Sequence, residues 1–363
     1  MKEYLTNRQI AFIIFGITVG YGIMPLTKNI VEKTGTGGWS SLVVAIVIAI
    51  ILTYILTYLG YVHENKTIDE YSEILTGKYI TFIFIGIYII YYFLAFTLVT
   101  RMASEMVKLN VLVKTPVWVL SLFILAIAYY AVIKRLQNIA RICEIYGMII
   151  IIAFIITIGA MFTQGKLINV KPFFVVEDIK IYFKAIPITI FPLLGMELIG
   201  IIPFDRKINN KKIFKYTTFM VAFIGILYIL EMEACMAIMG QSVIYYKASL
   251  LATIRRIEIT SFQFLSRLDG IVIVFWLMAV LCTVIIWAYG TVFLIHKYCR
   301  RIHFNLLAFI VMALSFIVSR MPKTVDLVEE IYNNVSYVGF IAAGVIPMIL
   351  LIITKIKKYD KKI

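Results

Sequence analysis

Apolar runs, each long enough to cross a lipid bilayer as a helix, follow one another along most of this chain. A bilayer core of about 30 Å requires roughly 20 apolar residues per helix at about 1.5 Å per residue. At that width the sequence predicts ten spans, which run Gln9–Ile30, Ser41–Tyr61, Ile80–Val107, Val117–Ile133, Cys143–Phe162, Phe183–Pro203, Ile213–Met239, Leu268–Ile295, Phe304–Val318 and Val335–Ile353. Strands of a membrane β-barrel would instead alternate in polarity over segments of about ten residues, whereas these runs are continuous.

The chain is therefore predicted to be an all-α integral membrane protein. It forms a single transmembrane domain over residues 1–363, with helices one to five within 9–162 and six to ten within 183–353.

Composition and charge placement agree with a membrane as the solvent. Hydrophobic residues make up 62% of the chain and the mean hydropathy is +0.96, which is more apolar surface than a soluble core could bury. Many of the basic residues behind the net charge of +15 lie after predicted helices four, six and eight and in the C-terminal tail. The opposite side also carries basic residues, such as Lys171 and Arg255. Cytoplasmic loops carry an excess of Lys and Arg, so we assign the side with more basic residues to the cytoplasm. Both termini are therefore expected to be cytoplasmic. The charge thus indicates orientation and attraction to membrane lipid, not nucleic-acid binding.

The sequence contains no recognisable catalytic or metal-binding motif. His63, His296 and His303 form no HExxH pattern, and neither a GxSxG elbow nor a Walker phosphate loop occurs. The four cysteines lack CxxC spacing and lie in or beside apolar runs, so we expect no disulfide, metal or cofactor. The first span lacks a small-residue cleavage site and is expected to remain in the mature protein. We therefore predict that the chain is not an enzyme.

The first predicted helix is interrupted near its centre by GYGIMP, Gly20–Pro25. In hydrocarbon, unpaired backbone groups are costly, so a broken helix is tolerated only where protein or a water-lined cavity satisfies them. Two interpretations are open at this point. Gly16 and Gly20 form a GxxxG pattern that would let a neighbouring helix approach, or the break marks a binding site.

The sixth predicted helix carries a matching interruption, PITIFPLLGMELIGIIP, between Pro187 and Pro203. If the ten helices form two sets of five, helices one and six occupy corresponding positions. Paired Gly and Pro interruptions at corresponding positions are typical of inverted-repeat transporter folds with a site near the membrane midplane. We therefore predict a 5+5 inverted repeat with broken helices one and six, based on helix count and break placement alone.

The two breaks define a candidate ligand site. A half-helix beginning near Gly22–Met24 would present free N–H groups and a positive dipole end to a carboxylate. The half-helix ending near Gly20 would offer free carbonyls to an ammonium group, so the pair suits a zwitterion. The predicted ligand-binding residues, which include side chains flanking the breaks, are Gly20, Tyr21, Gly22, Ile23, Met24, Tyr91, Tyr92, Phe191, Gly195, Met196, Glu197 and Trp276.

Each polar or aromatic candidate also has a purely structural interpretation. A carboxylate near a helix centre is costly, so Glu197 is expected to face the bundle interior, either in the site or as a buried contact with the backbone. Tyr91 and Tyr92 on helix three, and Trp276 on helix eight, would touch a ligand or simply pack against neighbours.

Other charged residues within the spans are expected near the outer ends of their helices. Arg101 and Glu105 lie four residues apart on helix three, which favours an ion pair. Glu231 and Glu233 on helix seven are expected to reach an outer interface or vestibule.

Over essentially its whole length the chain resembles the spore germination receptor B subunit (GerAB-type) family, within the amino acid/polyamine/organocation (APC) transporter superfamily. The resemblance rests on LTNRQIAFIIFGITVGYGIMPL, TGTGGWSSLVV, IDEYSEILTGK, FPLLGMELIGIIPF, IRRIEITSFQFLSRLDGIVIVFWLMAV and IPMILLIITKIKK, in this order. It implies a ten-helix LeuT-like fold in the inner membrane of a bacterial spore. It further implies a small germinant, usually an amino acid, and a larger A subunit and a C-subunit lipoprotein as partners. By position, Gly20–Met24 and Phe191–Glu197 match the unwound stretches that hold the ligand in that fold.

Two functions remain in competition on the sequence alone. In the first, the chain is a receptor subunit that senses an amino acid-like germinant and signals spore germination through partner subunits. In the second, it is an amino-acid permease with alternating access, with proton coupling through Glu197 as one form of it. One fold can host both, so the family resemblance alone favours the receptor.

Overall fold

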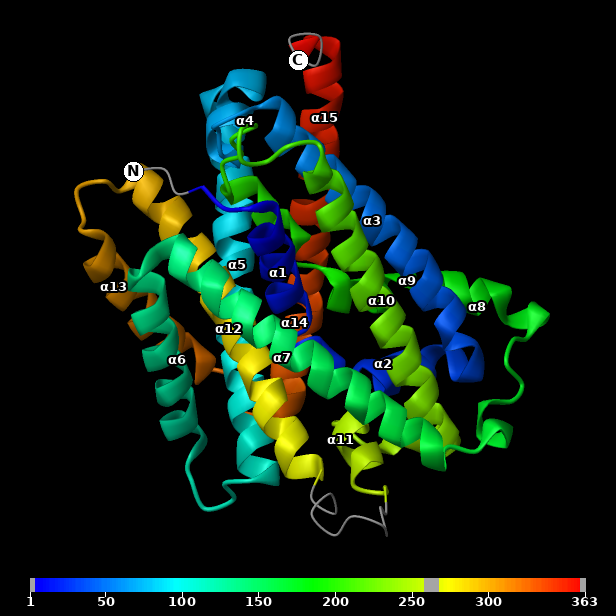
Figure 1. Cartoon of the computed structure of the whole chain (residues 1–363). Helices are drawn as coiled ribbons and strands as arrows, with labels where there is room; N and C mark the ends of the chain where they lie inside the picture. Colours follow the sequence, from blue (N-terminus) through cyan, green and yellow to red (C-terminus); the bar gives the residue numbers. More distant parts are fainter. Residues whose placement is uncertain (1–3, 258–267, 360–363) are drawn as a thin grey trace.

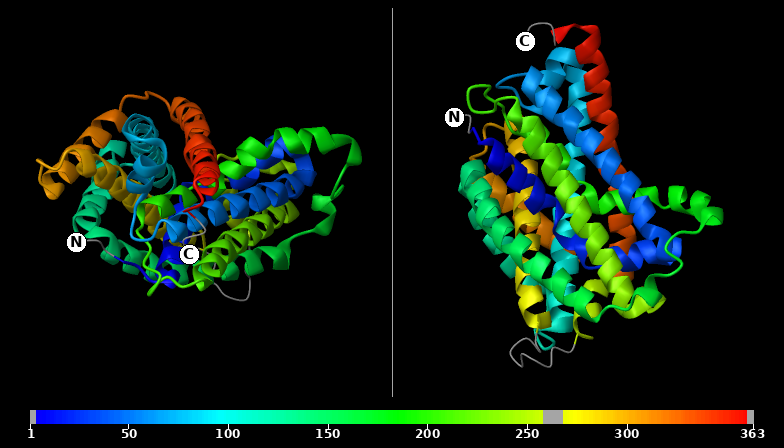
Figure 2. Two further views of the ribbon diagram at one scale, coloured as in Figure 1. Left: turned by 90° about the horizontal axis from the view of Figure 1, so that it is seen from above. Right: turned by 45° about the vertical axis from the view of Figure 1, so that its right-hand side comes forward.

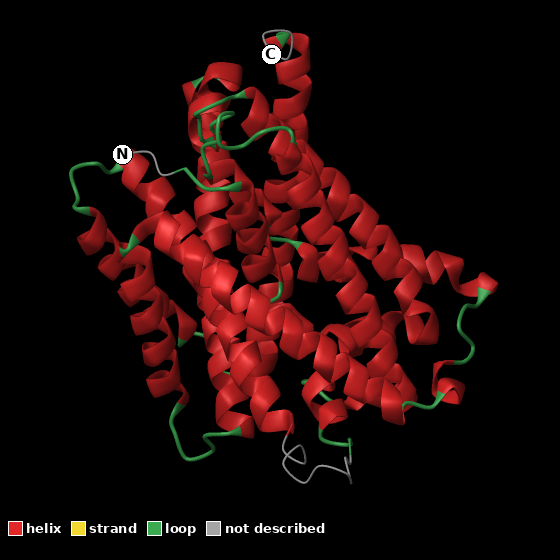
Figure 3. Ribbon diagram, in the orientation of Figure 1, coloured by secondary structure: helices red, strands yellow, loops and turns green. Residues whose placement is uncertain are grey.

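In the computed structural model, which describes residues 4–257 and 268–359, helices build the whole architecture and no strand occurs within those residues (Figure 3). The helices are α1 (Asn7–Thr18), α2 (Leu26–Thr34), α3 (Gly38–Val62), α4 (Ile68–Thr76), α5 (Lys78–Asn110), α6 (Val117–Ile133), α7 (Arg135–Gln164), α8 (Ile179–Lys184), α9 (Ile186–Ile190), α10 (Lys212–Met239), α11 (Ser249–Ile254), α12 (Leu268–Tyr298), α13 (Phe304–Ser319), α14 (Val325–Phe340) and α15 (Ile346–Ile356).

The predicted all-α membrane protein of about ten crossings is confirmed. Among the described residues, six helical runs are long and apolar enough to cross a membrane, and α6 and α13 are shorter apolar helices. The first crossing is divided into α1 and α2. The sixth is divided into several short pieces, α8, α9 and two 3₁₀ segments, Phe191–Leu193 and Met196–Ile201. The interruptions read from the sequence are therefore breaks in the helices themselves.

The last crossing begins earlier than the hydropathy pattern predicts, at Val325 instead of Val335. Its first turns carry Asp326, Glu329 and Glu330, and such charges lower the hydropathy of any window that includes them. This crossing also contains a π-helical segment, Ile341–Val345, between α14 and α15.

Polar stretches that the sequence analysis left outside the spans contain two short helices. The first is α4, which begins at a capping box in which Thr67 and Glu70 satisfy each other's backbone N–H groups. The second is α11, which packs against α2, α10 and α12. Both are too short and too polar to register as spans.

The core lies where α5 and α12 pack along each other, with α1 enclosed by α7, α10 and α12 (Figure 1). Both chain termini lie toward one end of the bundle, together with α4, whereas α11 lies at the other (Figures 1 and 2). The Lys357 ammonium group fastens α15 to α4 there by donating to the Leu75 carbonyl at 2.9 Å. The end that carries the termini is called the terminal end below, and the other the opposite end.

Candidate functional site

The break in the first crossing leaves carbonyl groups that neighbouring helices satisfy. Helix α1 ends at Thr18 and α2 begins at Leu26, with only a 3₁₀ turn, Tyr21–Ile23, between them. On α12, the Thr283 hydroxyl donates to the Gly16 carbonyl at 2.8 Å. On α10, the Tyr228 hydroxyl donates to the Thr18 carbonyl at 3.0 Å. Surrounding protein therefore supplies the hydrogen bonds that hydrocarbon could not.

The break in the sixth crossing centres on Gly195, whose φ of +126° favours glycine. A Cβ atom at this position would lie 2.7 Å from Ile17 Cγ2 on α1. The Gly195 N–H donates to Glu197 Oε2 at 2.8 Å, so the glutamate caps the segment after the break. Both the backbone conformation and the close approach of α1 thus require glycine here.

The two breaks lie against each other. A Cβ atom on Gly22 would be 3.1 Å from Pro192 Cβ, and one on Gly20 would be 2.1 Å from Thr283 Oγ1. The Tyr228 hydroxyl, already bonded to the first break, is also 3.5 Å from the Pro192 carbonyl. One tyrosine on α10 therefore links the interrupted backbone of both crossings.

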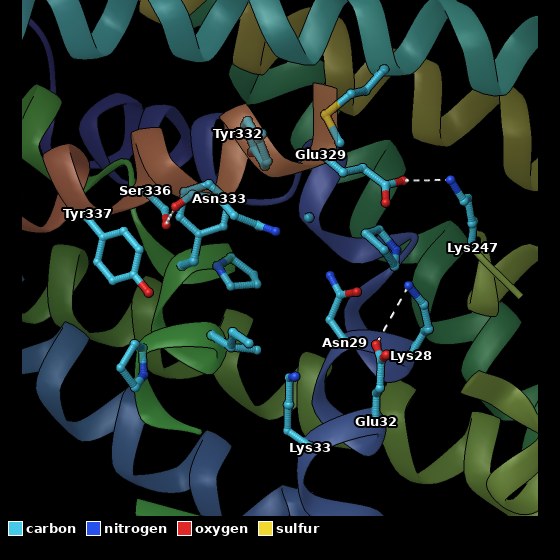
Figure 4. Close-up of a pocket in the computed structure, with 17 residues that line it drawn as sticks. Lys28, Asn29, Glu32, Lys33, Lys247, Glu329, Tyr332, Asn333, Ser336 and Tyr337 are labelled. Atoms are coloured by element: carbon cyan, nitrogen blue, oxygen red, sulfur yellow. Dashed lines mark hydrogen bonds and ion pairs between the residues drawn. The ribbon is translucent and has the colours of Figure 1, made fainter. Parts of the chain in front are cut away.

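A cavity of about 370 Å³ extends from this junction between α2 and α14 (Figure 4). Gly22, Phe191 and Pro192 line it, and the Phe191 ring makes an edge contact with Tyr332 at a centroid distance of 4.7 Å. Side chains of both charges line the remaining walls, namely Lys28, Lys33, Lys247, Glu32 and Glu329. A cavity of this size with both cationic and anionic groups matches the chemistry of a small zwitterion.

The wall of this cavity is tied to the opposite end of the molecule through Lys247. Its ammonium group pairs with Asp326 and lies 3.8 Å from Glu329, both on α14. Hydrogen bonding to Asp326 raises the pKa of Lys247, so its positive charge is kept at neutral pH. The loop before α11 is therefore held to α14 by charge.

Hydrogen bonds also join α11 to the first break. The Ser249 hydroxyl donates to the Met24 carbonyl at 2.9 Å, and the Leu250 N–H donates to the same oxygen at 3.3 Å. In turn the Lys28 N–H donates to Ser249 Oγ at 3.3 Å. A shift of α2 would therefore strain or break these hydrogen bonds unless α11 moved with it.

A second polar group lies deeper, around Glu197. Its side chain is fully buried, and the Tyr91 hydroxyl and the Trp287 indole N–H face its carboxylate. Within the described chain, Glu197 Oε1 and the polar atoms of Tyr91, Tyr92 and Trp287 have no hydrogen-bond partner. Buried polar groups without partners are costly, so the Tyr91 hydroxyl and the Trp287 N–H, which face the Glu197 carboxylate, are the donors placed to stabilise it.

The remaining predicted site residues fall in two other places. Ile23, Met24 and Trp276 line a small apolar cavity of about 30 Å³ between the first break and α7. Met196 is fully buried in the core beside Glu197. Tyr21 lies in the 3₁₀ turn of the first break. The structure thus brings Gly22 and Phe191 to one cavity, and Tyr91, Tyr92 and Glu197 to one cluster, but does not gather all candidates around one space.

Residues of the site that the sequence analysis missed include Tyr228, Thr283 and Trp287. Each is a polar or amphipathic residue inside an apolar span, which is a usable signal, but the sequence alone does not say which neighbour it meets. Lys28 was a clearer omission, because a charge within the predicted span Gln9–Ile30 is itself informative.

Two expectations about charged residues have different outcomes. The Arg101–Glu105 ion pair is confirmed, with a distance of 2.7 Å between Arg101 Nη2 and Glu105 Oε1. The expectation that Glu231 and Glu233 reach an outer interface or vestibule is wrong, because Glu231 is fully buried and Glu233 is only 9% exposed. Glu231 instead accepts a hydrogen bond from Thr27 on α2 at 3.1 Å. Helix α2 covers this part of α10, which hydropathy could not reveal.

Comparisons with known proteins agree with this architecture. Residues 4–327 match the sequence model of the family described as "Spore germination protein". The chain is 26% identical to spore germination protein YndE of Bacillus subtilis (strain 168), over 99% of this chain and 98% of that protein. It is 25% identical to spore germination protein A2 of the same organism, over 76% of each chain.

Solved structures show the same fold at low sequence identity. Mhp1, a nucleobase-cation-symport-1 family transporter solved closed with bromovinylhydantoin bound, is similar with a TM-score of 0.70 and 12% identity, over 96% of this chain and 78% of its own. MhsT in complex with L-phenylalanine also gives a TM-score of 0.70 and 12% identity, over 97% and 89% of the two chains. The predicted LeuT-like fold is thereby confirmed.

Proposed function

Because this chain belongs to the spore germination protein family, we propose that it is a membrane-embedded germinant receptor subunit of the spore inner membrane. It binds a small amino acid-like germinant between broken crossings one and six, and signals germination through a receptor A subunit and a C-subunit lipoprotein. The termini face the cytoplasm in this proposal, and the cavity at α2 and α14 opens away from it.

The observation that carries the proposal is the junction of the two breaks at the inner end of a cavity with mixed charge. Gly22 and Phe191, which the sequence singled out, both line that cavity. Lys28 and Lys33 would attract the carboxylate of a zwitterion, and Glu32 and Glu329 its ammonium group. The ligand would then settle against the breaks, with the polar cluster around Glu197 behind them.

A receptor must also pass the binding event to another protein, and the bonds from Met24 to α11 suggest how. A ligand that favours one position of α2 also favours one position of Ser249 and of the loop that carries Lys247. The free energy available for signalling is the difference between the ligand's affinities for the two positions.

The second candidate function is amino-acid transport on the same scaffold. The similarity to transporter structures, including one with a bound amino acid, favours it. Glu197 would then take part in coupling, since it is buried within the bundle with one oxygen unpaired. Fold cannot separate the two candidates, because a shared fold does not fix function.

The deciding experiment uses the purified chain in proteoliposomes. A panel of amino acids is tested for saturable binding and, in the same vesicles, for uptake against a gradient. Binding without uptake supports the receptor, and concentrative uptake supports the permease. Absence of both, with folded protein in the vesicles, contradicts the proposed ligand class.

Glycine variants test the position of the site. Gly22→Leu and Gly195→Leu place side chains at the two breaks, where Pro192 and Ile17 leave no room, and should abolish binding. Gly86→Leu is the matched control, because nothing lies within 4 Å of a Cβ atom at that position on α5. If both break variants insert, fold and bind the ligand with unchanged affinity, the breaks are not the site.

A further inference from the structure

A cavity of about 430 Å³ lies at the terminal end and shares no lining residue with the proposed germinant cavity. It is partly open and is lined by the start of α7, the end of α12, the start of α13, the N-terminal turn of α4 and the segment around Ile201 and Pro203. Its lining residues are Thr67, Glu70, Arg135, Leu136, Ile201, Pro203, Tyr289, Phe293, His296, Lys297, Arg300 and Phe304.

The charge that lines this cavity is mainly positive and only partly compensated. Lys297 is neutralised by Asp69 and Glu70, with Nζ to carboxylate distances of 3.0 and 2.9 Å. Across the described residues, neither Arg135 nor Arg300 has a carboxylate within ion-pair distance. Asp69 and Glu70 of α4 are therefore already paired with Lys297, and two guanidinium groups that line the cavity remain for an external anion.

Apart from Thr67 and His296, the remaining lining is apolar and aromatic. The Arg135 guanidinium lies over the Phe304 ring, 4.9 Å from its centroid, and Lys297 Nζ lies 5.4 Å from the centroid of Phe293. These contacts hold the cationic groups at the edge of an apolar surface. The cavity is thus amphipathic, with positive charge beside rings at the ends of membrane-crossing helices.

We propose that this cavity binds the phosphate group of an anionic ligand, with Arg135 and Arg300 as the groups that recognise it. Planar guanidinium groups suit phosphate because each can donate two parallel hydrogen bonds. An anionic phospholipid would place its phosphate on the arginines and its glycerol and acyl carbons on the aromatic wall. Basic pockets between helices at the cytoplasmic face are known to hold such headgroups. A soluble phosphate compound would use the same arginines without the apolar wall.

The test uses the full chain, delipidated in detergent and measured by native mass spectrometry with added lipid. Wild-type protein is expected to retain phosphatidylglycerol at least tenfold more tightly than the zwitterionic phosphatidylcholine. The double variant Arg135→Gln/Arg300→Gln is expected to lose this preference. Arg320→Gln is the matched control, since its guanidinium also lies over a ring, Phe316 at 5.8 Å, but lines none of the cavity.

A second arm separates the two sources of phosphate. Pyrophosphate is titrated calorimetrically into protein in neutral-lipid nanodiscs. Saturable pyrophosphate binding that the double variant loses, without a phosphatidylglycerol preference, assigns the site to a soluble phosphate. The charge-conserving variant Arg135→Lys/Arg300→Lys should keep part of the binding, so that lost charge is distinguished from lost fold. A lipid preference that survives in Arg135→Gln/Arg300→Gln, or no anion binding in either arm by wild-type protein, overturns the proposal.

Discussion

At the scale of single residues, a few side chains form hydrogen bonds with backbone groups that the interrupted helices leave without helical partners. Tyr228 and Thr283 come from different helices, and both donate to carbonyl groups that the first break releases. Gly195 supplies the positive φ that the second break needs, and Glu197 caps the 3₁₀ segment after it. These residues stabilise an irregular backbone at membrane depth, which is allowed only where protein surrounds it.

Glu197→Gln separates charge from shape at this position. The amide oxygen can still accept from the Gly195 N–H, so we expect the variant to fold with wild-type stability within about 1 kcal/mol. Amino-acid affinity in proteoliposomes should fall at least tenfold, because the carboxyl group beside Tyr91 and Trp287 is replaced by an amide that can neither carry a negative charge nor exchange a proton. Affinity equal to that of wild-type protein would leave Glu197 with a structural role only.

His63 makes part of the stability depend on pH at the terminal end. It stacks on Tyr71 at 5.1 Å and bonds to Thr354, and its burial, with a smaller effect of Lys66, lowers its pKa to about 4 from 6.5. The unfolded chain therefore binds a proton before the folded one does, and the free energy of unfolding falls as pH drops from 6.5 toward 4. His63→Gln should show a smaller decline in thermal midpoint over this range. His303→Gln, at an exposed position, is the control, and equal declines in all three proteins would contradict the assignment.

At the scale of elements, the proposed function makes the half-helix α2 the part that would contact the ligand and pass the change to α11. The face of α2 toward α14 lines the cavity, and the start of α2 lies at the break, where the Met24 carbonyl just before α2 receives two bonds from α11. The tenth crossing is also interrupted, and the Tyr88 hydroxyl donates to the Ala342 carbonyl in the π-helical segment at 2.5 Å. In the first and tenth crossings, a side chain from a continuous helix therefore donates a hydrogen bond to a carbonyl group of the interrupted segment.

Ser249→Ala tests transmission from α2 to α11. The variant loses the hydroxyl that joins Met24 to Lys28, but the Leu250 N–H still donates to Met24. We expect ligand affinity to change by less than tenfold, since one neutral hydrogen bond contributes about 1 kcal/mol. Ligand-induced protection of residues 240–257 from hydrogen exchange should be reduced.

The matched control for this experiment is Ser242→Ala. Its hydroxyl bonds only locally, to the Met239 carbonyl at 2.6 Å, and lies in the same outer segment. Full ligand-induced protection in the Ser249 variant would show that the Met24 contact does not carry the signal.

At the scale of the whole molecule, two cavities of opposite character occupy the two ends. The cavity between α2 and α14 has both charges and reaches the breaks, whereas the one at the terminal end is mainly basic and lies beside aromatic rings. Ten crossings place both termini on one side, and the basic tail favours the cytoplasm for that side. Ligand detection and attachment to lipid or phosphate would therefore face different compartments.

Cysteine labelling tests this orientation. Cys143, Cys235 and Cys282 are buried, and Cys299 is exposed at the terminal end of α12. A membrane-impermeant maleimide should leave right-side-out vesicles unlabelled and should label Cys299 once the vesicles are inverted or opened. Cys299→Ser should remove the signal. Labelling of intact right-side-out vesicles would reverse the proposed orientation.

Much of the architecture followed from local sequence, because the bilayer imposes a length and an apolar character on each helix without reference to its neighbours. The ten spans, the two breaks and the Arg101–Glu105 pair are of this kind, since each depends on residues adjacent in the chain or one turn apart. The early start at Val325 was missed for the same reason, because a hydropathy window rejects charged turns that the fold accommodates.

Contacts between distant segments were decided only by the tertiary structure. That Glu231 is buried beneath α2, that Tyr228 reaches both breaks, and that Trp287 instead of Trp276 faces Glu197 all depend on how helices rotate and pack. Within a membrane protein every helix is apolar over most of its surface, so the sequence marks weakly which face meets which neighbour. The sequence by itself determined where the backbone breaks, and packing decided which side chains surround the breaks.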